Sequence, residues 1–138
     1  MTQPTYSAIR AAYASFLTAQ TGIRATANRV SQVNPPMALI LPVTGSVASY
    51  GRTMDGQANY MMRAVVLVSL ADSTFGEDVL DAYLATDTPQ SIQAAVAADP
   101  TLGGIAANAV VLEATGYGEM NIAGVDYLAC SFVTEVFI

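Results

Sequence analysis

The feature that most constrains the fold is the stretch of residues 58–70, where every second side chain is apolar. The even-numbered positions of this stretch are Tyr60, Met62, Ala64, Val66, Val68 and Leu70. Because successive side chains of a β-strand point to opposite faces of a sheet, this alternation predicts a long strand with one face in the core. Met61, Val65 and Leu67 on the other face are apolar too. We therefore expect helices or a neighbouring subunit to cover part of that face.

This strand is expected to be the return arm of a long β-hairpin over residues 46–70. Its tip is Asp55-Gly56, a dipeptide that suits a turn with positive φ. A buried strand is expected at residues 37–41, after Asn34-Pro35-Pro36, which favours an extended entry.

A second hairpin is expected near the end of the sequence. Its strands span residues 109–117 and 125–137, joined through residues 118–124. In the first strand we expect Val110, Leu112 and Ala114 to share one side. In the second strand one side carries Leu128, Cys130, Phe132 and Val136.

Three helices are expected. Apolar residues at spacings of three and four predict an amphipathic helix over residues 6–17, with Gly22 as its stop. A capping box at residues 74–77 opens a short helix that continues to Leu84. Another short helix is expected to begin at Thr88, with Pro89 at its first position, and to end near residue 99. The polar stretch of residues 25–34 is expected to be irregular.

The order of these elements predicts the fold class. A helix, a strand, a long hairpin, a helical pair and a second hairpin indicate an α+β fold with a mostly antiparallel sheet. The N-terminal helix and the central helical pair should pack on that sheet. At 138 residues the chain is expected to form a single domain, residues 1–138, with its own core.

The composition indicates a surface that needs partners. Hydrophobic residues make up 53% of the chain and charged residues 12%, against a charged share of about 25% in typical soluble domains. With so few charges, apolar side chains must either face solvent or be covered by other subunits. Contiguous exposed apolar patches usually mark interaction surfaces.

The charges are segregated along the chain. The first 63 residues carry five arginines and one carboxylate, a net charge of +4, and the rest of the chain carries ten carboxylates, −10. Two oppositely charged parts favour head-to-tail contacts between identical copies, as in a ring. The alternative is that the acids only stabilise helix N-termini or face solvent. The candidate interface residues are Arg52, Arg63, Asp72, Glu77, Asp78 and Asp81.

Several function classes are disfavoured. A net charge of −6 without any lysine argues against a nucleic-acid reader. The longest apolar run is far shorter than the roughly 20 residues that span a bilayer, and no signal peptide is read at the N-terminus. A single cysteine excludes an intrachain disulfide and fits a reducing compartment.

The sequence contains little catalytic equipment. Histidine and lysine are absent, so common general bases are missing. Cys130 shares a strand face with Leu128 and Phe132, which predicts a core residue rather than a nucleophile. The acids at positions 72–81 do not have the spacing of a calcium-binding loop. We therefore expect no enzyme activity and no catalytic, cofactor or metal site.

The succession of patterns resembles the tail terminator, or tail completion, proteins of long-tailed bacteriophages. The resemblance covers roughly residues 9–136. It rests on the N-terminal helix that ends at Thr21-Gly22 and on the strand Met37 to Pro42, followed by Thr44-Gly45. It also rests on the hairpin that leads into Arg63-Ala64-Val65-Val66-Leu67-Val68, on Leu80-Asp81-Ala82-Tyr83-Leu84 after that strand, and on the last strand, Tyr127-Leu128-Ala129-Cys130-Ser131-Phe132-Val133. The segment of residues 88–104 is longer than in the simplest members of that family.

The resemblance implies a structural virion protein, made in the host cytoplasm. It would form a hexameric ring that caps the tail tube, contacts the tail tube protein and the head-neck connector protein, and lets DNA pass without specific binding. Such families have no catalytic motif. The alternatives are another ring of the neck, such as a head-completion or connector protein, a small oligomeric enzyme acting through carboxylates or Cys130, and a ligand-binding module.

Overall fold

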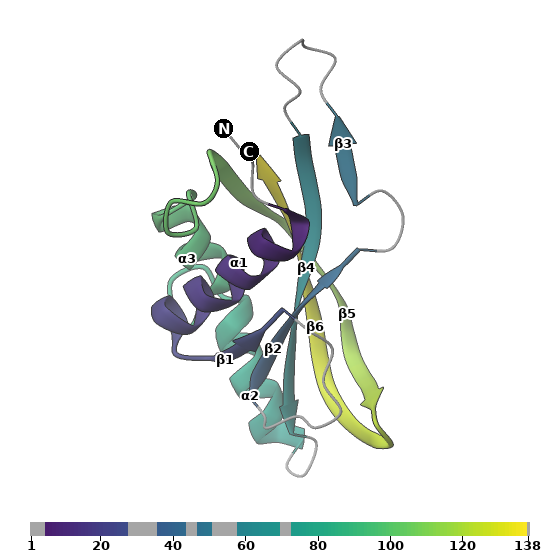
Figure 1. The fold of residues 1–138 in the computed structure, drawn as a ribbon. Coiled ribbons are helices and arrows are strands. Elements are labelled where there is room, and N and C mark those ends of the chain that lie inside the picture. Colours follow the sequence, from purple (N-terminus) through teal and green to yellow (C-terminus); the bar gives the residue numbers. More distant parts are fainter. Residues whose placement is uncertain (1–4, 28–35, 44–46, 51–57, 70–72, 138) are drawn as a thin grey trace.

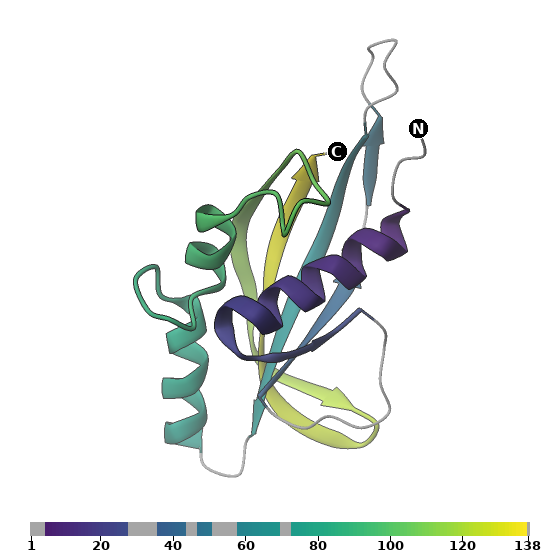
Figure 2. The same cartoon turned by 60° about the vertical axis from the view of Figure 1, so that its left-hand side comes forward.

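The computed structural model describes residues 5–27, 36–43, 47–50, 58–69 and 73–137. In this part of the chain, three helices lie on one face of a strongly twisted, six-stranded sheet (Figures 1 and 2). The strand order is β1-β2-β4-β6-β5, and β3 pairs with β4 as well. Only β1 and β2 are parallel; the other pairs are antiparallel. The predicted α+β fold is therefore confirmed.

The described elements follow each other in this order: α1 (Tyr6–Thr21), β1 (Arg24–Thr26), β2 (Met37–Pro42), β3 (Ala48–Tyr50), β4 (Ala58–Ser69), α2 (Ser73–Leu84), α3 (Ile92–Ala98), β5 (Asn108–Ile122) and β6 (Val125–Phe137). The central strand is β4, which pairs with β2 and β3 on one side and with β6 along its whole length on the other. The predicted long hairpin is confirmed as the β3–β4 pair, while its predicted tip, Asp55-Gly56, lies outside the described residues.

Helix α1 agrees with the prediction from its spacing. The Thr5 hydroxyl accepts a hydrogen bond from the Ala8 amide at 3.1 Å, which caps the first turn. Gly22 ends the helix with φ 79°, a left-handed conformation that suits glycine. On the sheet-facing side, the fully buried Tyr13 exchanges a hydrogen bond of 2.9 Å with Thr134 of β6. This bond ties the helix to the middle of the sheet.

Two expectations for the N-terminal half and the helical pair are wrong. Ala25 and Thr26, expected to be irregular, belong to the short strand β1, which pairs with β2 in parallel. The second short helix begins at Ile92, not at Thr88. Ser91 is its N-cap, because the Ser91 hydroxyl accepts from the Ala94 amide at 3.0 Å. Thr88 instead donates to the carbonyl oxygen of Ala82 at 2.6 Å, near the end of α2.

The second hairpin is confirmed, but β5 is longer than expected and reaches Ile122. A two-residue turn at Ala123 and Gly124, with φ 54° and 85°, joins it to β6. The pairing register shifts between Val111 and Glu113 and again between Thr115 and Gly118. Each shift inserts one extra residue into β5, as a β-bulge does.

These bulges overturn the expected face of β5. A bulge reverses the alternation of side chains, so Val110, Leu112 and Ala114 do not share one side of the strand. Bulges also increase the local bend and twist. The end of the β5–β6 hairpin accordingly curves away from the helices (Figure 1).

Two hydrophobic clusters lie on the two faces of the sheet. The larger one, between the sheet and the helices, includes Met62, Ala64, Val66, Cys130 and Phe132. The even positions of β4 thus face the core, as predicted, and so do the predicted core residues of β6.

The smaller cluster lies on the other face. It contains Leu39, Leu41, Val65, Leu67, Tyr127 and Ala129, with Met37, Met120 and Ile122 packed against it. We expected helices or a neighbouring subunit to cover this face. That expectation is wrong for Val65 and Leu67, which are fully buried within the subunit. Side chains of β2, β6 and the curved end of the β5–β6 hairpin surround them.

Candidate subunit interface

The six residues predicted to form a subunit interface are only partly covered by the structure. Arg52 and Asp72 lie outside the described residues. The other four are Arg63 of β4 and Glu77, Asp78 and Asp81 of α2. All three acids are solvent-exposed, whereas Arg63 is half-buried.

Arg63 lies on the face of the sheet opposite the helices, and α2 lies in the helical layer (Figure 1). In one subunit, therefore, this arginine and the acids of α2 are on opposite faces of the sheet. Pairing of Arg63 with the acids of a second copy remains a prediction.

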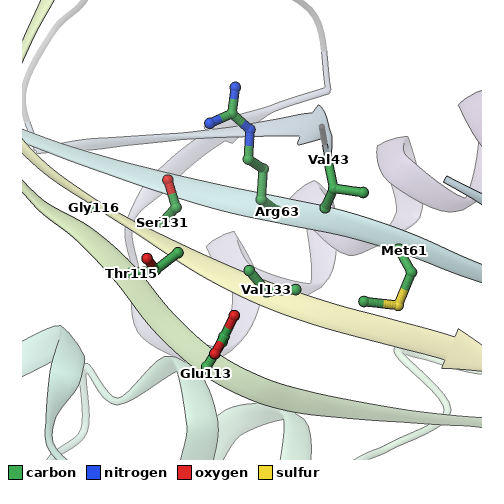
Figure 3. A pocket seen from close by; sticks show the side chains of 8 residues that line it. All are labelled: Val43, Met61, Arg63, Glu113, Thr115, Gly116, Ser131 and Val133. Atoms are coloured by element: carbon green, nitrogen blue, oxygen red, sulfur yellow. The ribbon is translucent and has the colours of Figure 1, made fainter. Parts of the chain in front are cut away.

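The surroundings of Arg63 form an open cavity of about 410 Å³ on that face. Figure 3 shows the side chains that line it, from the end of β2 across to β5. They are Val43, Met61, Arg63, Glu113, Thr115, Gly116, Ser131 and Val133. The register explains the row at its centre, because Arg63 pairs with Val133 and Val133 pairs with Glu113.

The charge of Arg63 is held near the edge of this cavity. Its Nε donates to the carbonyl oxygen of Pro42 at 3.2 Å. In Figure 3 the guanidinium points away from the carboxylate of Glu113. The cavity is thus open and lined by both polar and apolar residues, with one cation and one anion on opposite sides of β6. An open surface of this kind suits contact with another protein better than enclosure of a small molecule.

A more exposed surface lies along β5, the edge strand of the sheet. Its exposed apolar side chains are Val110, Leu112 and Tyr117, with 40%, 52% and 45% of their surface accessible. We call these three residues, which follow the strand edge without all lying on one side of it, the β5 edge patch. Within the described part of the chain, no strand pairs with the outer side of β5. An edge strand with exposed apolar side chains is a surface prone to association.

Tyr117 of the patch is oriented by an acid of α2. Its hydroxyl donates to the Asp81 carboxylate at 3.0 Å. Desolvation, this hydrogen bond and the nearby carboxylates raise the pKa of Tyr117 to about 12. The hydroxyl therefore stays protonated near neutral pH, and the carboxylates of α2 lie beside the patch. Glu113 and Glu119 of β5 add further negative charge along the same strand.

The opposite edge of the sheet carries positive charge. We call the part formed by α1 and β1 the α1–β1 side. Arg24 of β1 is exposed there. Arg10 of α1 is held more tightly, because its Nη1 donates to the carbonyl oxygen of Ala27 at 2.8 Å and its guanidinium lies 5.2 Å from the centre of the Tyr6 ring.

Cys130 is a core residue, as predicted. It is 1% exposed, and burial raises the pKa of its thiol. Its Sγ lies 3.6 Å from the carbonyl oxygen of Thr115. A buried, protonated thiol is a poor nucleophile.

Two properties of the described residues bear on other kinds of site. Among them, no three His, Cys, Asp or Glu side chains gather closely enough to hold a metal ion. None of the helices in the same part of the chain has the length and apolar character needed to cross a membrane.

Sequence reasoning missed the β5 edge patch. The alternation of Val110, Leu112 and Ala114 predicts one regular strand face, because alternating apolar residues normally face a core. Their exposure follows from the position of β5 at the edge of the sheet and from its bulges. The only signal in the sequence is the low charge content, which predicts an exposed apolar surface without placing it.

No protein-family model matches the chain, and no curated protein matches it.

Proposed function

We propose that this protein is a structural virion protein of a phage tail, a tail terminator that assembles into a hexameric ring. The ring caps the tail tube and joins it to the neck of the head. In this role the protein is not an enzyme, and its partners are further copies of itself, the tail tube protein and the head-neck connector protein. Its place is the virion, at the junction of tail and neck.

The observation that supports this proposal best is the β5 edge patch beside the carboxylates of α2, with the exposed Arg24 at the opposite edge of the sheet. Two different, oppositely charged surfaces favour head-to-tail association. Head-to-tail contacts generate a ring when the rotation between copies closes. The resemblance of the sequence pattern to tail terminator proteins, together with the α+β fold, favours a tail terminator ring over other rings.

The acidic balance of the chain agrees with a DNA conduit. The net charge is −6, and a basic channel would hold passing phosphates rather than let them slide. We therefore expect DNA to pass through the ring without specific binding.

Two experiments test the proposal. The purified 138-residue chain should have a mass near six times the subunit mass of 14.4 kDa, and electron-microscopy class averages should show closed rings. A protein that stays monomeric at every concentration, alone and with tail tubes, would contradict the proposal.

The second experiment separates the terminator from another neck ring. Phage particles lacking the protein should accumulate overlong or unjoined tails, and supplying the protein should restore joining. Heads that leak DNA while tails have normal length would instead indicate a head-completion or connector protein.

A further inference from the structure

We propose that the β5 edge patch of one copy docks on the α1–β1 side of the next copy. This inference rests on the proposed function, because it names the two surfaces that make the ring. The contact is heterologous: each copy presents β5 to one neighbour and α1 with β1 to the other.

The need for a partner follows from the patch itself. Val110, Leu112 and Tyr117 are each at least 40% exposed, and they lie on the one long strand whose outer side has no described strand beside it. A small cavity of about 160 Å³ lies next to the patch between β5 and the helices, lined in part by Leu84, Leu112 and Phe132. Covering this region would remove apolar surface from water, which favours association.

Charge selects a second copy as the partner. Glu113 and Glu119 of β5 and the acids of α2 make the surroundings of the patch negative. Of the arginines in the described residues, Arg63 shares a cavity with Glu113 and Arg10 is bonded to the carbonyl oxygen of Ala27. The exposed Arg24 is on β1, at the other end of the strand order. A two-fold contact of β5 with β5 would place acidic strands beside each other, which like-charge repulsion disfavours.

The α1–β1 side can also approach an apolar surface at low cost. The solvent-facing positions of α1 include Ala8, Ala11, Ser15 and Ala19. Small neutral side chains allow close approach without removing charges from water. Arg24 is on β1, which packs against α1, and it can meet a carboxylate of the neighbouring β5 at the rim of the contact.

Cysteine cross-linking tests this pairing directly. The variant with both Leu112→Cys and Arg24→Cys should react with a flexible bis-maleimide to give a ladder of covalent oligomers that ends at the ring. Each single variant should give almost no covalent dimer, because equivalent positions lie at different interfaces in a head-to-tail ring. The wild-type chain is a matched control, because its one cysteine, Cys130, is buried.

A second control reports random collisions. Leu112→Cys combined with Ala97→Cys places the second thiol at an exposed position of α3, and it should give no ladder. Efficient dimers from Leu112→Cys alone would overturn the inference in favour of a β5–β5 contact. Cross-linking of Leu112→Cys only to tail tube protein would overturn it in favour of a different partner.

Charge reversal tests the same contact without introduced cysteines or a cross-linker. Arg24→Glu and Glu113→Arg should each weaken self-association by up to about fivefold, as expected for an exposed ion pair. Combining them should recover part of the loss. Rings that form without the double-cysteine ladder and without charge rescue would overturn this inference and leave the ring proposal standing. The absence of any ring would contradict the proposed function itself.

Discussion

β4 and β5 lie on either side of β6 and share the run Ala-Val-Val-Leu, yet their apolar side chains differ in burial. Both contain alternating apolar residues, and both pair with β6 along most of their length. Val65 and Leu67 of β4 are fully buried, whereas Leu112 of β5 is 52% exposed. β4 has paired strands on both sides and covered faces, while β5 has a free outer edge among the described strands.

Apolar side chains in a strand are therefore not by themselves a sign of core packing. The apolar side chains of β4 stabilise the subunit, and those of β5 remain available for contact with another molecule. Mutations in the two strands should therefore have different effects. Changes in β4, and in the equally buried β6, should lower the stability of the subunit, and changes in β5 should weaken assembly.

The largest effect is expected in β6, the strand between them. Phe132 is 2% exposed and belongs to the core under the helices. Phe132→Ala should lower the free energy of unfolding by about 3–5 kcal/mol, through lost burial and a residual cavity. Chemical denaturation followed by circular dichroism measures this change. A loss below about 1 kcal/mol would mean that this core is not packed as described.

Leu67→Ala tests the smaller core on the other face. Because Leu67 is fully buried within one subunit, we expect a loss of about 2–5 kcal/mol in unfolding free energy, even in dilute, dissociated protein. A loss that appears only when the protein is assembled would show that a neighbouring subunit, not the β5–β6 hairpin, closes this face.

Two tyrosines extend the comparison to pH. Tyr13 of α1 is buried between this helix and the sheet, and Tyr117 is exposed on β5; the pKa of each is raised to about 12. Desolvation is the main cause in both cases. For Tyr13, the neutral form is favoured in the folded state, so its contribution to stability is complete below the ordinary pKa near 10 and is lost as pH rises from there through about 12.

Replacing each tyrosine separates the two regions. Tyr13→Phe should cost about 0.5–1.5 kcal/mol at neutral pH, because the 2.9 Å bond to the buried Thr134 is lost. It should also flatten the loss of stability between pH 10 and 12. Tyr117→Phe serves as the control and should change the denaturation curve little, since water screens an exposed group. Equal alkaline profiles for wild type and Tyr13→Phe would contradict this assignment.

The smallest effect on the subunit is expected from Leu112→Ala. Because Leu112 is largely exposed, the free energy of unfolding of the isolated subunit should change by less than about 0.5 kcal/mol. Self-association, measured by sedimentation over a concentration series, should nevertheless weaken. Unchanged association would show that the β5 edge patch is not an interface. The contrast between a strand that stabilises the subunit and a strand that mediates assembly would then fail.

Much of the secondary structure could be predicted because it depends on local patterns. The alternation in residues 58–70 indicated β4, and the spacing of Ile9 and Tyr13 with a later glycine indicated α1. The Ser91 cap was missed because Thr88 and Pro89 form an equally plausible local start. Hydrogen bonds to the end of α2 hold the residues between the two helices. The Thr88 hydroxyl donates to the carbonyl oxygen of Ala82 and the Ser91 hydroxyl to that of Ala85, so the helix starts after Ser91.

The candidate interface was predictable only in part. The sequence indicated separated charges and an apolar surface, and it named Arg63 and the acids of α2. It contained no sign that Arg63 and those acids lie on opposite faces of the sheet, because that depends on which side of the sheet the chain crosses after β4. Only the folded chain places them there.

The sequence by itself determined most of the strands and helices, that Cys130 is buried and that charge is scarce and segregated. These properties follow from side-chain periodicity and composition, which are local. The tertiary structure decided that β4 is central and β5 is an edge, that Val65 and Leu67 are buried within the subunit and that Leu112 is exposed. The physical reason is that burial depends on partners distant in sequence, and that two bulges in β5 change which way its side chains point.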